Sequence, residues 1–206
     1  MILIGQFDSP FVRRVGIALR LYDLPFEHRP WSVFGDADRI RPLNPLTRVP
    51  TLVLDDGFVL TDSHMILDYL DSLVEQPMFP RAGPARVRAL QATALACGLA
   101  EKAVSLFYEQ HLHTAHSPVW IARCQAQIGD VLTALDAERA AQTTGYWLGD
   151  RISHVDIALA CAWRFTTEAH PGLTDPTAHA ALAELTKRLE DGAVFQLMSQ
   201  PFIPPA

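Results

Sequence analysis

The spacing of apolar residues changes several times between residue 1 and about residue 75. Short apolar runs bounded by glycine, proline or aspartate are typical of buried strands, whereas apolar residues that recur every three or four positions are typical of helices. The turn Asp55-Asp56-Gly57 separates two short apolar runs and predicts a β-hairpin. The expected elements are a strand at 2–4, a helix at 10–22, a strand at 26–29, a short irregular helix within 33–43, strands at 51–54 and 58–60, and a helix from residue 63.

Helical spacing dominates the remainder of the chain. Three prolines and a glycine within residues 76–84 interrupt the pattern and predict a linker. Beyond the linker, apolar residues recur at helical spacing through residues 121–135 and again through 182–189. Residues 154–169 are apolar almost all round, which is typical of a helix at the centre of a bundle. We therefore expect two domains, an α/β domain at 1–75 with helices packed on a small sheet and an all-helical domain at 85–206.

The overall charge narrows the range of partners. The chain has 206 residues and a formal net charge of −6 at pH 7. Because the phosphates of nucleic acids need a basic surface, this charge argues against nucleic acid as the main partner. No apolar run approaches the roughly 20 residues that span a bilayer, and the first residues form too short an apolar stretch for a signal peptide. We expect a cytoplasmic protein that does not enter the membrane.

The cysteines predict no disulfide and no metal site. Cys97, Cys124 and Cys161 are odd in number and far apart, and they form neither a Cys-x-x-Cys pair nor a metal-ligand spacing. Each lies among apolar residues at helical spacing, so we expect buried free thiols.

The histidines at positions 111, 113 and 116 form the only histidine cluster. Near a predicted helix end they are better explained as solvated, or as favourable to the negative end of that helix, than as metal ligands. We therefore predict no metal cofactor.

The segment after the first predicted strand reads DSPFVRR from residue 8 to residue 14. Proline suits the first turn of a helix and serine before it is a good N-cap, so one interpretation of Ser9 is a purely structural cap. The same hydroxyl and the free N–H groups at the positive end of a helix can also bind an anion, and a thiolate is such an anion. We expect Arg13 and Arg14 on the helix surface or in structural ion pairs.

Two further segments could serve either structure or binding. A Val49–Pro50 bond in the usual trans form would be unremarkable, whereas a cis bond would leave the N–H and C=O of Val49 free to pair with an extended peptide. Ser63 is expected to cap the next helix, with Asp62 at its positive end. A substrate carboxylate could equally bind the N–H groups at that helix start, while Asp62 binds an ammonium group.

The order and spacing of these three segments resemble the thioredoxin-like domain of the glutathione transferase family. The similar runs in the family are S-P-x-x-R-R after the first strand, N-P-x-x-[KR]-V-P, and an acidic or amide residue followed by serine. Here these runs are Ser9–Arg14, Asn44–Pro50 and Asp62-Ser63. The run LGDRISHVD at 148–156 resembles the buried capping motif of the family's helical domain. The resemblance covers nearly the whole chain and implies an N-terminal thioredoxin-like domain followed by a C-terminal helical bundle.

The resemblance implies a cytosolic, bacterial-type member with a glutathione site in the first domain. The position of Ser9 lies beside the glutathione sulfur in the serine-type classes, where its hydroxyl would donate to the thiolate. The backbone of Val49 would pair with the cysteinyl part, with Pro50 in a cis bond. The remaining contacts implied are with the charged ends of glutathione, Asp62 and Ser63 at the γ-glutamyl end and Arg48 at the glycyl carboxylate.

This sequence departs from the family pattern at a few positions. Asp62 stands where a longer Glu or Gln is common, and Thr47 stands where Gly is frequent. Position 9 is not cysteine, and the predicted first domain contains no cysteine at all. Because serine cannot form a mixed disulfide, the resemblance disfavours the classes that reduce glutathione mixed disulfides.

The resemblance places a second substrate between the two domains. Trp31, Leu106, Phe107 and Tyr108 could wall an apolar pocket there, or could serve in ordinary core packing. The function implied is a glutathione S-transferase of detoxification, a two-fold homodimer that activates the thiol of its co-substrate glutathione for attack on a small apolar electrophile. The alternatives left open are a glutathione-dependent isomerase or peroxidase, and a non-catalytic glutathione- or ligand-binding protein of the same fold.

Overall fold

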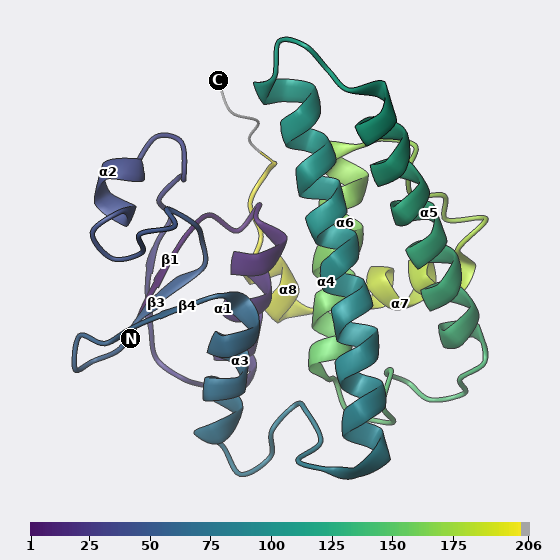
Figure 1. Ribbon diagram of the computed structural model, residues 1–206. Coiled ribbons are helices and arrows are strands. Elements are labelled where there is room, and N and C mark those ends of the chain that lie inside the picture. The colour runs from purple at the N-terminus through teal and green to yellow at the C-terminus, as the bar shows by residue number, and fades with distance from the viewer. Residues whose placement is uncertain (203–206) are drawn as a thin grey trace. The chain divides into compact units, whose positions relative to one another are not determined.

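The chain divides into two compact units, which are described one at a time. The computed structural model describes residues 1–202 (Figure 1). The first unit contains Met1–Met78 and the described residues from Ala193 onward, and the second contains Phe79–Gly192. The division after Met78 lies inside the segment predicted as the linker. The structure corrects the predicted end of the helical domain at residue 206, because the chain rejoins the first unit at Ala193.

A four-stranded mixed sheet forms the base of the first unit. Its strands are β1 (Ile2–Ile4), β2 (Glu27–Arg29), β3 (Thr51–Val53) and β4 (Val59–Thr61). The strand order is β2-β1-β3-β4, with β1 parallel to β2 and the other two pairs antiparallel. Leu3 and Leu52 are register partners across β1 and β3, and neither has exposed surface. This pair therefore belongs to the hydrophobic core of the first unit.

The helices of this unit follow the predicted order closely. They are α1 (Pro10–Leu21), α2 (Ala37–Ile40), α3 (Ser63–Ser72) and, from the end of the chain, α8 (Ala193–Leu197). The parallel pair β1 and β2 needs a crossover connection, which α1 supplies. Helix α1 also packs against α3 and α8. Helix α8 was not predicted, because five residues are too few to show a helical period.

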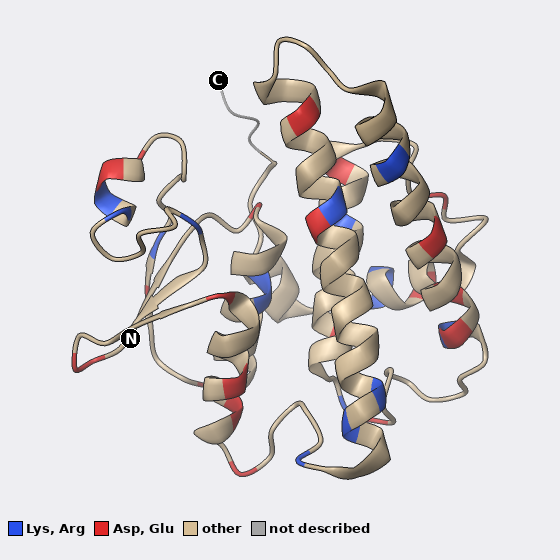
Figure 2. Cartoon of the chain, in the orientation of Figure 1, with Lys and Arg blue, Asp and Glu red and all other residues tan. Residues whose placement is uncertain are grey.

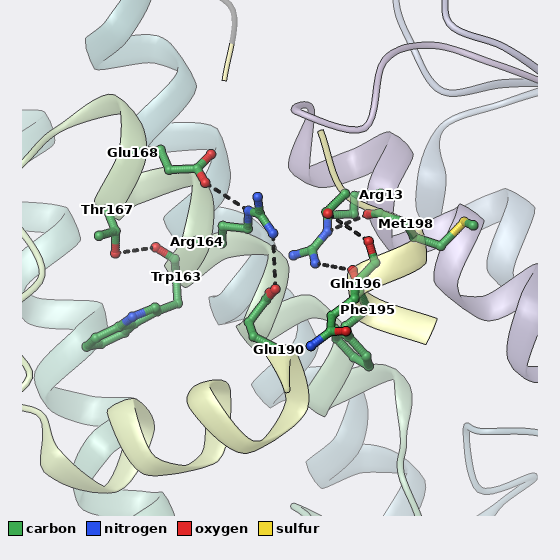
Figure 3. Close-up of polar contacts among 10 residues, drawn as sticks. Arg13, Trp163, Arg164, Thr167, Glu168, Glu190, Phe195, Gln196 and Met198 are labelled. Carbon is green, nitrogen blue, oxygen red and sulfur yellow. Dashed lines mark hydrogen bonds and ion pairs between the residues drawn. The ribbon is translucent and has the colours of Figure 1, made fainter. Parts of the chain in front are cut away.

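The arginines of α1 lie in a different environment from the one predicted. Arg13 and Arg14 are only 2% and 1% exposed, so the expectation of a position on the helix surface is wrong. Nε and Nη2 of Arg13 each donate a hydrogen bond of 2.8 Å, to the carbonyl oxygens of Met198 and Phe195 respectively (Figure 3). The outer face of α1 is therefore covered by α8 and the residues that follow it, which periodicity within α1 does not reveal.

The second unit is a bundle of four helices. They are α4 (Gly83–Leu112), α5 (Pro118–Ala140), α6 (His154–Ala169) and α7 (Ala180–Glu190). Helix α6 packs against both α4 and α7, and α5 packs against the same two helices. Most of α6 is buried, which confirms the prediction of a central helix at 154–169. Within residues 1–202, no helix has the length and apolar character needed to cross a membrane.

The three cysteines are free and buried, as predicted. Burial raises the pKa of the Cys124 thiol. A raised pKa keeps the sulfur in its protonated, weakly nucleophilic form. Cys124 therefore serves as a small apolar group in the helical core.

Asp156 holds together the start of α6. Its Oδ1 accepts the Trp147 N–H at 2.9 Å, and its Oδ2 accepts the backbone N–H and the hydroxyl of Ser153 at 2.8 Å and 2.6 Å. Burial raises the pKa of the Asp156 carboxyl, and the three donors act in the opposite direction. A buried carboxylate is stable only with such partners. The capping interaction predicted between Ser153 and Asp156 is thus present, and it also fixes the preceding loop.

Replacing Asp156 by alanine should strongly destabilise the second unit. The change leaves two buried N–H donors without an acceptor, at about 1–3 kcal/mol each. We expect the free energy of unfolding, measured by urea denaturation, to fall by roughly 3 kcal/mol. Asp130→Ala is the matched control, since Asp130 is an exposed residue of α5. Equal stability of the two variants would contradict this role of Asp156.

Candidate functional site

Ser9 lies at the N-terminus of α1, where a hydroxyl meets the positive end of a helix. It is the N-cap, followed by Pro10, and its Oγ accepts the Val12 N–H at 3.4 Å. This hydrogen bond is long, and among the described residues the Ser9 hydroxyl donates to no acceptor. The two interpretations of Ser9 are therefore compatible. Its oxygen caps the helix, while its proton can be donated to an anion beside the helix end.

The loop before β3 is held by a buried amide. Asn44 is 2% exposed, and its Nδ2 donates to the carbonyl oxygen of Arg48 at 2.8 Å and to Oγ1 of Thr51 at 3.2 Å. Its Oδ1 accepts the Leu46 N–H at 3.0 Å. Sequence reasoning included Asn44 in the family run but gave it no role. Its position before a proline in a predicted loop was the available signal, because asparagine commonly hydrogen-bonds nearby backbone in turns.

The Val49–Pro50 peptide bond is cis, as the family resemblance implies. Val49 lies outside the β3 ladder, and its N–H and C=O form no hydrogen bond with any other described residue. Pro50 is buried and Val49 is partly exposed. Val49 thus offers one donor and one acceptor that an extended peptide can use.

Gly5 brings this loop close to α1. Its φ is +129°, and a Cβ placed on it would lie 2.4 Å from Cγ2 of Val12 and 2.8 Å from Cβ of Val49. Any side chain at this position would push the loop and the helix apart. The first turn of α1, which begins after Ser9, and the backbone of Val49 are therefore neighbours because residue 5 is glycine.

The start of α3 supplies the third part of the site. Asp62, and not Ser63 as predicted, is the N-cap, since its Oδ1 accepts the His64 N–H at 2.8 Å. Burial raises the pKa of the Asp62 carboxyl, but the backbone N–H groups and the imidazole of His64 outweigh this, and the pKa is lowered. Asp62 is therefore ionised at neutral pH. Its φ of +69° is unusual for a residue with a side chain, and such backbone strain is concentrated at functional sites.

Ser63 and Arg48 occupy contrasting environments. Ser63 is buried, and its Oγ accepts a hydrogen bond of 3.4 Å from Nη1 of Arg14, which links α1 to the start of α3. Arg48 is exposed, and it takes part in no ion pair among the described residues. Its backbone is fixed by Asn44 while its guanidinium can reach a dissolved anion.

Known protein families match both units of this chain. The model of the glutathione S-transferase N-terminal domain matches residues 3–78, and that of the glutathione S-transferase C-terminal domain matches residues 118–188. Together they cover more than half of the sequence. The chain belongs to the glutathione S-transferase family. The fold predicted from the three short segments, a thioredoxin-like domain followed by a helical bundle, is confirmed.

Individual members of the family resemble this chain over most of its length. The uncharacterized GST-like protein YibF of Escherichia coli is 29% identical over 79% of this chain and 80% of its own length. A probable maleylacetoacetate isomerase of Drosophila melanogaster is 27% identical over 99% of this chain and 84% of its own. A glutathione transferase family member from Pseudomonas fluorescens, crystallised with bound glutathione, has a TM-score of 0.84 and 29% identity, covering 98% of this chain and 99% of its own.

The residues predicted to contact a second substrate lie in both units of the chain. Trp31 is partly exposed, with the guanidinium carbons of Arg39 and Arg29 at 4.6 Å and 5.6 Å from its ring centroid. Leu106 has no exposed surface, so it serves in core packing and we leave it out of the proposed pocket.

Phe107 and Tyr108 differ in exposure, since Phe107 is 4% exposed and Tyr108 is 36% exposed. Tyr108 therefore has the surface that a ligand contact requires, whereas Phe107 mainly packs within the second unit. A pocket that combines these residues with Trp31 stays a prediction.

The three histidines near the end of α4 each contact an oxygen atom of a nearby residue. His113 pairs with Glu109 at 2.8 Å, His111 contacts the Phe107 carbonyl oxygen at 2.9 Å, and His116 contacts the His113 carbonyl oxygen at 3.0 Å. Among residues 1–202, no group of three or more His, Cys, Asp or Glu side chains is arranged to hold a metal ion.

His170 should make stability depend on pH. Burial lowers its pKa below 6.5, His111 adds to this effect, and the contact with the Ala103 carbonyl oxygen opposes it. Below about pH 6.5 the unfolded chain therefore takes up a proton that the folded chain does not, so stability falls as the pH falls. For one group the slope is at most about 1.4 kcal/mol per pH unit.

Urea denaturation of the wild type and His170→Gln between pH 7.5 and pH 5.5 measures this effect, because glutamine can still donate to Ala103 but does not titrate. We expect the wild type to lose more stability than the variant on acidification. Parallel pH profiles would contradict the assignment.

Replacing Thr47 by glycine should stabilise the loop that precedes β3 in the first unit. Thr47 has a φ of +50°, which is unfavourable for a β-branched residue. Glycine removes this strain, and we expect the free energy of unfolding to rise by about 1 kcal/mol in urea denaturation. Thr47→Ala, which keeps a Cβ, should gain much less. A fall in stability of Thr47→Gly would show that the threonine side chain makes a favourable contact.

Proposed function

We propose that this chain is a glutathione S-transferase that activates the glutathione thiol for attack on a small apolar electrophile. The observation that carries the proposal is the Ser9 hydroxyl, which caps α1 at its positive end with its proton available to an anion. Glutathione is the co-substrate favoured by family membership and by the glutathione bound in the related Pseudomonas fluorescens protein. No metal takes part in the proposed reaction.

The proposed contacts follow the three parts of the site. The free N–H and C=O of Val49, before the cis Pro50, suit the cysteinyl backbone of glutathione. The ionised Asp62 carboxylate suits the γ-glutamyl ammonium, and its side chain is 60% exposed. Ser63 at the start of α3 suits the γ-glutamyl carboxylate, and Arg48 suits the glycyl carboxylate. Both charged ends of the peptide then meet groups of opposite charge.

The energy available from Ser9 is large enough for catalysis. A free thiol is only a few per cent ionised at pH 7. A hydrogen bond to a charged group contributes about 1.5–3 kcal/mol, which lowers the thiol pKa by about 1–2 units. The thiol proton passes to solvent, and the thiolate sulfur then forms a bond to the electrophilic carbon. In a substitution this carbon releases its leaving group as an anion; in an addition its π bond breaks and the neighbouring atom takes up a proton from solvent. Ser9 stabilises the nucleophile and is not itself the nucleophile.

A second candidate activity is glutathione-dependent isomerisation. It is favoured by the similarity to the probable maleylacetoacetate isomerase of Drosophila melanogaster, which extends over 99% of this chain. The same thiolate would serve both reactions, since an isomerase adds it reversibly to the substrate double bond. Assays with chlorodinitrobenzene and with maleylacetoacetate separate the two candidates. Chlorodinitrobenzene loses chloride when the sulfur bonds to its ring, whereas maleylacetoacetate loses no group when it is isomerised.

We further propose a cytoplasmic homodimer with no nucleic-acid partner. Helices α2, α4 and α5 each carry both basic and acidic residues (Figure 2). With a net charge of −6, such a surface does not favour phosphate binding. Sedimentation at several protein concentrations tests the homodimer.

Replacing Ser9 by alanine should raise the pKa of the bound thiol. We expect saturable binding of reduced glutathione to the wild type in calorimetry, with a thiol pKa lowered by about 1–2 units in ultraviolet absorbance titrations. Ser9→Ala should still bind but lose most of that shift, while the control Ser72→Ala, at an exposed serine of α3, should keep it. Binding with no shift dependent on Ser9 would remove this residue from the mechanism. No binding at millimolar glutathione would favour a non-catalytic protein of the same fold.

A further inference from the structure

The last described residues of the chain lie across α1 in the first unit. Phe195 and Met198 are buried, and the carbonyl oxygens of both accept hydrogen bonds from the Arg13 guanidinium (Figure 3). The Arg13 guanidinium also lies 5.8 Å from the centroid of the Phe195 ring. Because a buried guanidinium requires fixed acceptors, these contacts anchor residues 193–198 on the helix that Ser9 caps.

The same segment reaches the turn that leads into Ser9. Oε1 of Gln200 accepts the backbone N–H of Phe7 at 2.9 Å, a hydrogen bond between residues 193 positions apart. Phe7 lies between β1 and Ser9, and the Ser9 N–H donates to the Gln6 carbonyl oxygen at 3.2 Å. Gln200 therefore holds the backbone of Phe7, two residues before Ser9.

The opposite side of this turn is fixed independently. The Phe7 ring stacks on His28 with a centroid distance of 3.9 Å, and Nε2 of His28 is 2.7 Å from the Gly5 carbonyl oxygen. Phe7 also packs on Gly16 of α1, where a Cβ would lie 2.6 Å from the Phe7 ring and 3.3 Å from Sδ of Met198. The turn is thus held between β2, α1 and the C-terminal segment.

We infer that residues 193–200 are a positioning element for the Ser9 turn, with Gln200 as its positioning residue. The inference rests on the proposed function, in which the Ser9 hydroxyl is aimed at the glutathione sulfur. Hydrogen bonds weaken steeply with misalignment, and small displacements of a reacting group cost large factors in rate. Gln200 acts on the thiolate only through Ser9 and touches neither glutathione nor the reacting atoms.

The variants Gln200→Met and Gln200→Glu test the inference in the full-length protein. Methionine keeps the length of the side chain but cannot accept the Phe7 N–H effectively, whereas glutamate keeps an acceptor oxygen. Leu197→Ala is the matched control, since Leu197 lies on α8 with 61% exposure. Urea denaturation establishes that each variant is folded before binding is measured.

The first measurement is the pKa of the bound glutathione thiol. We expect Gln200→Met to lose about half of the wild-type lowering and to reduce kcat for a model electrophile about tenfold with little change in KM. Gln200→Glu and Leu197→Ala should behave as wild type. In a Ser9→Ala background, Gln200→Met should have no further effect, because the two residues act in one chain of contacts.

A wild-type thiol pKa in Gln200→Met would overturn the inference. So would an equal effect of that substitution with and without Ser9.

The second measurement separates this inference from the proposed function. Hydrogen exchange of the Phe7 amide, followed without glutathione, should be accelerated at least several-fold by Gln200→Met and restored by Gln200→Glu. Unchanged exchange would overturn the positioning role even if glutathione binds. Accelerated exchange together with no glutathione binding by the wild type would instead reject the proposed function and leave the anchored turn established.

Discussion

Two guanidinium groups buried on α1 determine how the first unit is arranged. Removing an ion from water costs several kcal/mol even after relaxation, so each group requires acceptors held in place. Arg13 obtains them from the carbonyl oxygens of Phe195 and Met198, and Arg14 donates to Ser63 at the start of α3. Helix α1 therefore has fixed neighbours on two sides. Its N-terminus, with the Ser9 hydroxyl, is thereby held in place by contacts on both sides of the helix.

A site built at a fixed helix end has a direct chemical consequence. The positive end of α1 and the hydroxyl that caps it are present before any ligand arrives, so no reorganisation is needed to stabilise a negative charge there. Gly5 allows the loop carrying Val49 to approach the same helix, and Asn44 keeps the backbone of that loop in place. The contacts of Gly5, Asn44 and Arg14 thus hold the three segments of the proposed glutathione site in fixed positions.

The second unit uses a buried carboxyl group, that of Asp156, for a purely structural purpose. Asp156 accepts hydrogen bonds from Ser153 and Trp147 and so joins a loop to the central helix α6. The hydrogen-bond donors to the Asp156 carboxyl come from Trp147 and Ser153, which are near it in sequence. No feature of this carboxyl points to a ligand contact. In both units a polar group that is costly to bury selects one arrangement of the chain, because alternative packings would leave it without its partners.

Features that depend on nearby residues were predictable from the sequence. The helix at 154–169, the hairpin around Gly57 and the capping role of Asp156 all follow from patterns within a few residues. The Ser9 cap was predicted for the same reason, and the family resemblance indicated the cis Val49–Pro50 bond.

The burial of Arg13 and the contact between Gln200 and Phe7 were decided only by the tertiary structure, since they join residues more than 180 positions apart. A polar stripe on a helix looks the same in sequence whether water or another segment covers it, and only the folded chain shows which one does.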